Sequence, residues 1–261
     1  MVYRPWSIVP NPVDVNRDIS RMTYDGIIFD FNGVLWWDAP LIETGWQRTA
    51  MQLRGHPFSD EEFARVVLGC NGRDTQEYLA GRGLEEKENR RLIDEREAAY
   101  RELCLQQGEK FRLSPGAEDL LDYLKARSIP RTIATASEKM NVDFFVEHLR
   151  LERWFDPRQI VFDNGVLRSK PAPDFYLQAA ANIKLNPSGC VVVEDSLSGM
   201  RAARAAGIGY LVALGYASAD DDGLKEIPVD AAVRNLGELD RHRLFGGDRW
   251  TLAGSRTAAG T

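Results

Sequence analysis

The feature that most constrains the fold is a series of short, continuous apolar runs that recur along the chain. They cover residues 26–31, 129–134, 159–162, 190–193 and 209–214, with a weaker one at 229–233. Continuous rather than alternating apolar residues are typical of strands buried on both faces of a parallel sheet. We therefore expect a core built on a parallel sheet.

Helical patterns separate these runs. Residues 117–127 place three leucines on one face, and residues 138–149, 173–182 and 198–206 show similar spacing. The last of these patterns ends at Gly207, a residue common just after a helix. Alternation of strands and helices predicts an α/β fold with a doubly wound parallel sheet.

One long interval breaks this alternation. Residues 37–111 contain helix-like segments and no good strand, which predicts an all-helical subdomain inserted after the first strand. A chain of 261 residues is long enough for one large core with such an insertion. The predicted organisation is an α/β core at 23–36 and 112–245, a helical insertion at 37–111, and extensions at 1–22 and 246–261.

Charge and cysteine content exclude several classes of protein. The net charge of -6 gives no electrostatic attraction to nucleic acid or to an anionic membrane, and no apolar run has the length of a membrane span or a signal peptide. The three cysteines form no CxxC pair, and three histidines suggest no zinc cluster. We expect a cytoplasmic protein, a monomer or a weak homodimer, without nucleic-acid or membrane partners.

Polar residues follow several of the predicted strands. Asp30 ends the first run, Thr135 follows the second, and the pair Glu194-Asp195 follows the fourth, while Lys170 lies in the segment after the third. In an open parallel sheet, ligands bind outside the carboxyl ends of the strands. These side chains are therefore expected to converge at one edge of the sheet.

This combination of residue types suits phosphoryl transfer. A carboxylate can act as the nucleophile, and a hard divalent cation held by carboxylates offsets its repulsion from a phosphate dianion. A hydroxyl, a lysine and backbone N–H groups can stabilise charge on the transferring oxygens. Each residue also has an ordinary interpretation. Asp30 could form a turn, Lys170 could be a surface lysine, and Glu194-Asp195 could be loop acids; the ordered set favours function.

Four strings carry a family resemblance. FDFNGVL, TIATAS, SKPAPDFYLQAA and VVVEDSLSGMRAARAAG resemble, in order, the four motifs of the haloacid dehalogenase-like superfamily. The resemblance spans roughly residues 24–214, and the interval after the first motif fits that family's helical cap. The branch most similar to this chain contains phosphoglycolate phosphatases, β-phosphoglucomutases and related sugar-phosphate phosphatases.

The resemblance implies a role for each matching residue. It implies that Asp30 is the nucleophile, that Thr135 binds phosphate together with the adjacent Ala136, and that Lys170 pairs with both the phosphate and Asp30. Ser137 is a competing hydroxyl two residues from Thr135, although the register to the family favours Thr135.

The implied cofactor is Mg²⁺. The resemblance assigns it to Asp30, to the backbone carbonyl of Asn32 and to Asp195, with Glu194 bound directly or through water. In the cap, the segment 69–74 resembles a substrate-contacting loop, so Arg73 is a candidate for binding the substrate; an exposed arginine at a helix start is the equal alternative.

Asn32 departs from the family pattern. Phosphatases of this family have an aspartate at this position, which protonates the leaving oxygen and then activates water; an amide cannot transfer a proton. Loss of such acid–base catalysis typically costs about 10²- to 10⁴-fold in rate. Asn32 could mark a slow phosphatase or phosphotransferase, an inactive relative that binds a phosphorylated ligand, or a substitution introduced to trap a complex. Partial deamidation of Asn32-Gly33 to aspartate is a further alternative.

Other enzyme classes on this fold fit less well. A dehalogenase needs no Mg²⁺ site, which Glu194-Asp195 indicate, and a phosphonatase needs a lysine in the cap, for which Lys87 is a lone candidate. A phosphomutase normally uses the missing acid. The sequence therefore predicts a Mg²⁺-dependent hydrolase of a small phosphate monoester, of sugar phosphate or phosphoglycolate type, acting through an aspartyl-phosphate on Asp30. The alternatives are an impaired phosphometabolite-binding pseudoenzyme and a phosphomutase or phosphotransferase.

Overall fold

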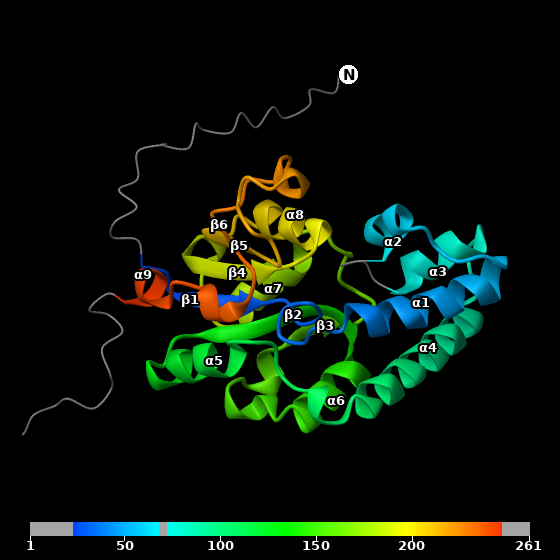
Figure 1. Ribbon diagram of the computed structural model, residues 1–261, viewed down its shortest axis with the longest axis horizontal. Coiled ribbons are helices and arrows are strands. Elements are labelled where there is room, and N and C mark those ends of the chain that lie inside the picture. Colours follow the sequence, from blue (N-terminus) through cyan, green and yellow to red (C-terminus); the bar gives the residue numbers. More distant parts are fainter. Residues whose placement is uncertain (1–22, 68–71, 247–261) are drawn as a thin grey trace, which may run out of the picture.

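A six-stranded parallel sheet forms the centre of the molecule (Figure 1). The computed structural model describes residues 23–67 and 72–246. The strand order is β3-β2-β1-β4-β5-β6, so the chain winds outward from β1 to one side and then from β4 to the other. The strands are β1 (Gly26–Phe29), β2 (Arg131–Glu138), β3 (Val161–Asp163), β4 (Cys190–Glu194), β5 (Tyr210–Leu214) and β6 (Ala231–Val233). The switch in direction between β1 and β4 is where open sheets of this type bind ligands.

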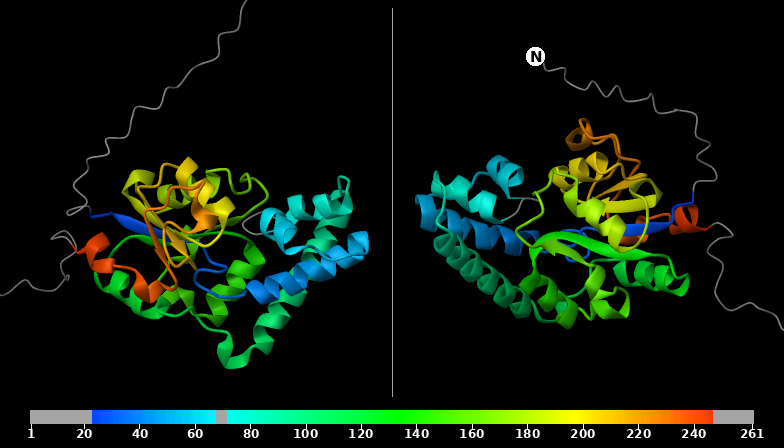
Figure 2. Two further views of the ribbon diagram at one scale, coloured as in Figure 1. Left: turned by 45° about the horizontal axis from the view of Figure 1, so that its top comes forward. Right: turned by 180° about the vertical axis from the view of Figure 1, so that it is seen from behind.

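Helices cover both faces of the sheet, as the predicted doubly wound fold requires (Figure 2). The helices α5 (Ala117–Ala126) and α6 (Lys139–His148) cover one face, and α7 (Asp174–Asn182) and α8 (Leu197–Ala205) cover the other. Strand β1 is buried throughout: Ile27 and Phe29 lie in one core cluster and Ile28 lies in the opposite one. Burial on both faces explains why the strand appears in the sequence as a continuous apolar run.

Four α-helices lie between β1 and α5 in the described residues, and they are called the inserted helices below. They lie together beside one end of the sheet in Figures 1 and 2. Trp46, Ala50, Phe58, Val67 and Leu79 give them a small apolar core of their own. The inserted helices are α1 (Ala39–Arg54), α2 (Asp60–Val66), α3 (Gly72–Ala80) and α4 (Glu86–Gln106).

Polar contacts join α4 to the sheet domain. Arg90 binds Glu138, at the end of β2, with a nitrogen–oxygen distance of 2.7 Å. Arg101 donates to Asn141 Oδ1 at 2.8 Å. These contacts hold α4 over the carboxyl ends of the strands. Among the described residues, no helix is long and apolar enough to cross a membrane.

The structure corrects the predicted end of the second strand. The prediction stopped it at residue 134 and placed Thr135, Ala136 and Ser137 in the following loop, but β2 continues to Glu138. Its pairing with β3 shifts register between Ala134 and Glu138. The three residues therefore form an irregular stretch within the strand. The sequence did not predict this extension, because no apolar run continues through these residues.

The C-terminal part of the core ends in a short helix that the sequence patterns did not predict. This helix, α9 (Arg241–Phe245), lies beside the start of β1, where Tyr24 N donates to Leu244 O at 2.9 Å. The predicted domain boundaries stay a prediction. The predicted extensions, apart from Gly246, lie outside the described residues.

Candidate active site

A tight turn follows β1 and presents the first motif to the sheet edge. The backbone N–H groups of Leu35 and Trp36 donate to Phe31 O at 2.8 and 3.1 Å, and Gly33 N donates to Trp36 O at 2.7 Å. Gly33 has a φ of +78°, and a Cβ at this position would lie 1.9 Å from Asp195 Oδ2. Glycine is therefore required here both for the backbone conformation and for the approach of Asp195.

The side chain of Asp30 lies at the end of β1, next to a buried lysine. Lys170 Nζ is 2.7 Å from Asp30 Oδ1 and 2.6 Å from Glu194 Oε1, so it bridges the ends of β1 and β4. Glu194 also accepts from Tyr176 Oη at 2.9 Å and from Ser196 N at 2.7 Å. Asp30, Lys170 and Glu194 are all buried, so this network is fixed by its own hydrogen bonds.

The acids in this network outnumber the cation. Burial raises the pKa of Asp30 to about 7, although Lys170 opposes the shift. Burial also raises the pKa of Asp195 well above its ordinary value, and Glu194 and Asp30 add to this. Burial alone would lower the pKa of Lys170, but the neighbouring carboxylates outweigh it and keep the lysine charged. Ionisation of all three acids would give more negative charge than Lys170 balances, so a bound cation would favour their ionised forms.

Three carboxylates could share such a cation. Asp30, Glu194 and Asp195 each offer an oxygen, and these oxygens lie within 4.8 Å of one another. Carboxylate oxygens are the ligands that Mg²⁺ prefers. The carboxylate oxygens of Glu194 already accept hydrogen bonds from Lys170, Tyr176 and Ser196. Asp30 and Asp195 are therefore better placed to bind a cation directly. The donor set fits a hard divalent cation, and the fourth predicted ligand, the carbonyl of Asn32, stays a prediction.

A cavity of about 140 Å³ opens in front of Asp30 and is closed on its far side by the inserted helices. Thr135, Ala136 and Ser137 of β2 line it together with Asp30 and Asp195. The structure thus brings the predicted phosphate-binding residues to the predicted nucleophile. Lys170 reaches the same place through its contact with Asp30.

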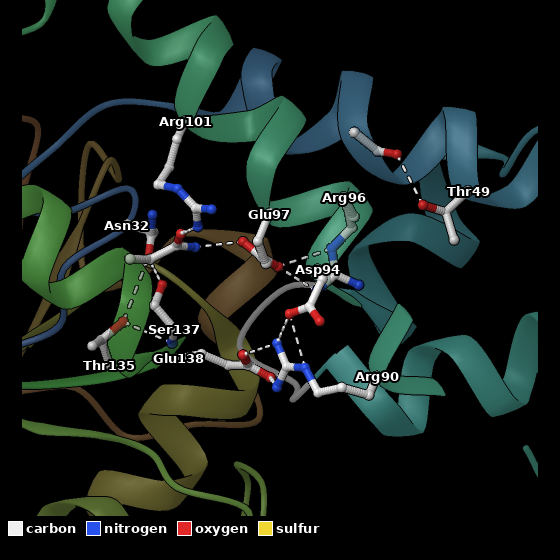
Figure 3. Close-up of polar contacts among 12 residues, drawn as sticks. Asn32, Thr49, Arg90, Asp94, Arg96, Glu97, Arg101, Thr135, Ser137 and Glu138 are labelled. Carbon is white, nitrogen blue, oxygen red and sulfur yellow. Dashed lines mark hydrogen bonds and ion pairs between the residues drawn. The ribbon is translucent and has the colours of Figure 1, made fainter. Parts of the chain in front are cut away.

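Asn32 lies between the two hydroxyls of β2 and the inserted helices (Figure 3). Its Oδ1 accepts from Ser137 Oγ at 2.8 Å and from Thr135 Oγ1 at 3.4 Å. Its Nδ2 donates to Asp38 Oδ2 at 2.6 Å and to Tyr100 Oη at 3.2 Å. Both ends of the amide are therefore hydrogen-bonded within the cavity.

Asp38 and Tyr100 are site residues that sequence reasoning missed. Asp38 is fully buried, accepts from Gly33 N at 3.1 Å, and forms a short hydrogen bond with Tyr100 Oη. Burial raises the pKa of Asp38 to about 6. In the sequence, Asp38 stands before Pro40 as an ordinary helix start, and Tyr100 lies 62 residues further along the chain.

Two cap residues named from the sequence lie away from Asp30. Arg73 lines a neighbouring cavity, is 46% exposed, and pairs with Glu77 at 3.2 Å and Glu86 at 2.7 Å. Residues 69–71 of the segment named from the sequence lie outside the described residues, and the prediction that Arg73 binds substrate stays a prediction. Lys87 is exposed on α4 and does not line the cavity that contains Asp30.

Comparison with known proteins decides the family. The model of the haloacid dehalogenase-like hydrolases matches residues 24–207. The chain belongs to the haloacid dehalogenase-like hydrolase family. This confirms the resemblance found in the four motifs, and with it the predicted enzyme type, a phosphatase of this family.

Curated relatives of this hydrolase match most of its length. It is 28% identical over 214 residues to a phosphorylated carbohydrates phosphatase from Thermotoga maritima, covering 80% of this chain and 94% of that protein. It is also 28% identical to hexitol phosphatase A of Escherichia coli, covering 87% and 98%.

Solved structures share the architecture of this hydrolase. A family IA hydrolase of the same superfamily from Entamoeba histolytica is 31% identical, with a TM-score of 0.73 over 84% of this chain and 96% of that one. A CbbY mutant from Rhodobacter sphaeroides, in complex with xylulose-(1,5)bisphosphate, has a TM-score of 0.69 at 22% identity over 84% and 97%. The second likeness concerns the fold.

Proposed function

We propose that this hydrolase transfers the phosphoryl group of a small sugar or polyol phosphate to Asp30 and then to water, with Mg²⁺ as cofactor. The observation that carries the proposal is the contact of Asp30 with Lys170 at 2.7 Å, at a sheet edge that also holds Asp195 and Thr135. The relatives named as phosphatases of phosphorylated carbohydrates and hexitols support the substrate class.

The residues would divide the first step as follows. An Asp30 oxygen attacks phosphorus, a new P–O bond forms to the carboxylate, and the bond to the leaving oxygen breaks. Lys170 and the Thr135 hydroxyl stabilise charge on the transferring oxygens, and Lys170 holds the Asp30 carboxylate in place. Bound at Asp30 and Asp195, Mg²⁺ supplies positive charge that offsets repulsion between nucleophile and phosphate.

Asn32 limits the proton transfers on either side of this step. Its amide can neither protonate the leaving oxygen nor take a proton from the water that regenerates Asp30. We therefore propose a slow enzyme that favours phosphates with acidic leaving groups and retains the phosphorylated Asp30 form. The same feature supports two further candidates, a phosphotransferase or phosphomutase, and a protein that only binds a phosphorylated metabolite.

Rapid-mixing assays with Mg²⁺ test this proposal. We expect turnover of an aryl phosphate to exceed that of a sugar phosphate, with an intact-mass increase of one phosphoryl group on the parent protein. Asp30→Ala should abolish both signals, whereas the same change at the exposed Asp143 should leave them unchanged. Saturable phosphate-ester binding without turnover, in the parent and in Asn32→Asp, would identify a binding protein instead. Halide release without metal would identify a dehalogenase.

The compartment and assembly belong to the same proposal. The thiols of Cys104 and Cys190 are buried and unpaired, which suits a reducing compartment and supports a cytoplasmic protein. The monomer or weak homodimer expected from the sequence stays a prediction. Light scattering across a range of protein concentrations measures it directly.

A further inference from the structure

An ion pair between Arg96 and Glu97 on α4 lines the cavity that contains Asp30. Arg96 donates to Glu97 Oε1 through Nε at 2.9 Å and through Nη2 in a shorter contact. The Arg96 guanidinium also lies 3.8 Å above the ring of Trp46. The side chains of Arg96 and Glu97 are only 8% and 14% exposed, so their positions are defined by packing as well as by charge (Figure 3).

The second oxygen of Glu97 is also bound. Glu97 Oε2 accepts from Asn141 Nδ2 in a short hydrogen bond, and Asn141 Oδ1 in turn accepts from Arg101 Nη1 at 2.8 Å. Asn141 belongs to α6 in the sheet domain, so this network joins the inserted helices to the rest of the site. The carboxylate of Glu97 is thereby fixed at the cavity wall.

This network decides what charge the wall presents. Among the described residues that line the cavity, Arg96 is the single cationic side chain, and Glu97 already neutralises it. Glu138 and Asp38 also line the cavity, but Glu138 is paired with Arg90, and Asp38 accepts hydrogen bonds from Asn32 and Tyr100. Arg101, which donates to Asn141, does not line the cavity. A second phosphate placed here would therefore meet the Glu97 carboxylate and, among the described lining residues, no unpaired cation, which is unfavourable in a partly buried site.

The same wall suits hydroxyl groups. Carboxylate oxygens accept hydrogen bonds at more than one lone pair each, so Glu97 can accept from a substrate hydroxyl while it keeps Arg96 and Asn141. The Trp46 ring and the aliphatic side chains of Leu41 and Ile42 add apolar surface to the lining. Polar acceptors beside apolar surface are typical of a site for a neutral polyhydroxylated group.

The geometry points to Glu97 as a specificity-determining residue that restricts this enzyme to monophosphates. The group released from phosphorus would carry hydroxyls and no second anionic group. This inference rests on the proposed function, because it places the reacting phosphate at Asp30 and the remainder of the substrate against α4.

Paired substrates test the inference. We would compare kcat/KM for a hexose monophosphate and the matching hexose bisphosphate, in the parent, in Glu97→Gln and in Glu95→Gln. Glu95 lies on the same helix but pairs with Arg91 at the exposed surface, so it is the matched control. We expect the parent and Glu95→Gln to prefer the monophosphate by at least about tenfold, and Glu97→Gln to reduce that preference by about tenfold or more, mainly through KM.

Two outcomes would overturn the inference. One is a parent enzyme that uses the bisphosphate as well as the monophosphate, a result that needs no variant and no assumption about folding. The other is a folded Glu97→Gln protein with an unchanged preference. Calorimetric binding of both esters to Asp30→Ala separates this question from the proposed function, because discrimination in binding is measurable even if no ester is hydrolysed.

Discussion

Asn32 donates from Nδ2 to Asp38 Oδ2 at 2.6 Å, so an amide and a buried carboxylate occupy neighbouring positions beside the nucleophile. In phosphatases of this family the position of Asn32 carries the carboxylate that handles protons. Here the nearest carboxylate belongs instead to Asp38, which is fixed by Gly33 N and Tyr100 Oη. The two residues must therefore be considered together when activity is altered.

Restoring the acid by Asn32→Asp alone should give an incomplete gain. Two carboxyl groups at this separation cannot both ionise near neutral pH, so one of them retains its proton. We expect the rising limb of the pH–rate profile of Asn32→Asp to lie at least about one pH unit above that of Asn32→Asp/Asp38→Asn. The double variant exchanges the two groups and keeps their hydrogen bond, and it should gain about 10²- to 10⁴-fold over the parent near neutral pH.

The control for this cycle is Asp38→Asn alone, which should not raise activity because neither position then carries an acid. Steady-state pH profiles with a sugar monophosphate provide the measurement. If the pH profiles of Asn32→Asp and Asn32→Asp/Asp38→Asn superimpose, Asp38 does not influence the group at position 32.

The fold was predictable because burial on both faces leaves a direct trace in the sequence. Strand β1 shows this: Ile27 and Phe29 pack in the core on one face of the sheet, and Ile28 packs in the core on the other. Apolar residues are therefore needed at all three positions. The extension of β2 through Thr135 and Ser137 left no such trace. Its strand geometry comes from pairing with β3 across an irregular register, which is a tertiary effect.

The site was predictable where strand ends determine it. Asp30 directly follows β1, Glu194 ends β4 and Asp195 follows it, so parallel pairing alone brings the three acids together. Glu97 and Tyr100 were not predictable because α4 carries Glu and Arg on most of its surface. Its few buried apolar residues, such as Ile93 and Cys104, are separated by charged ones, so the sequence does not show that this face turns toward Asp30. The packing of the inserted helices decides this.

Mg²⁺ affinity should rise with pH. The pKa of Asp30 is raised to about 7 without metal, so below that pH the carboxyl is mostly protonated and binding must release the proton. We expect affinity to increase by about tenfold per pH unit below 7 from the proton on Asp30, and more steeply where Asp195, whose pKa burial also raises, must release a proton as well. Calorimetry in buffers with different ionisation enthalpies measures the proton release directly. Equal affinity at about pH 6 and pH 8, with no proton release, would contradict the assignment of Asp30 as a ligand.

Lys170 should be essential for stability as well as activity. Lys170→Met removes the cation and leaves the buried Asp30 and Glu194 without a cationic partner, so the free energy of unfolding should fall by about 3–5 kcal/mol near neutral pH. The loss should shrink as pH falls, because protonation of the two carboxyl groups removes the unpaired charge.

Urea denaturation at several pH values measures this, with Lys139→Met as the matched control. Lys139 is 63% exposed, and its described ion pair is with the similarly exposed Asp143. Lys139→Met should therefore alter the free energy of unfolding by no more than about 0.5 kcal/mol. Equal effects of the two substitutions would show that the buried lysine is not the charge that balances the site.

Gly33→Ala should separate metal binding from general stability. The new Cβ would lie 1.9 Å from Asp195 Oδ2, and the side chain of Asp195 would have to move away from Asp30. Gly207→Ala is the control, because Gly207 has a similar φ of +73° but nothing within 4 Å of its added Cβ. Both variants should lose about 1–2 kcal/mol of stability from the left-handed backbone conformation. Only Gly33→Ala should also bind Mg²⁺ more weakly, by at least about tenfold, since one of its carboxylate ligands is displaced. Calorimetric titration of the two folded variants decides the matter: equal Mg²⁺ affinities would mean that Asp195 does not bind the metal.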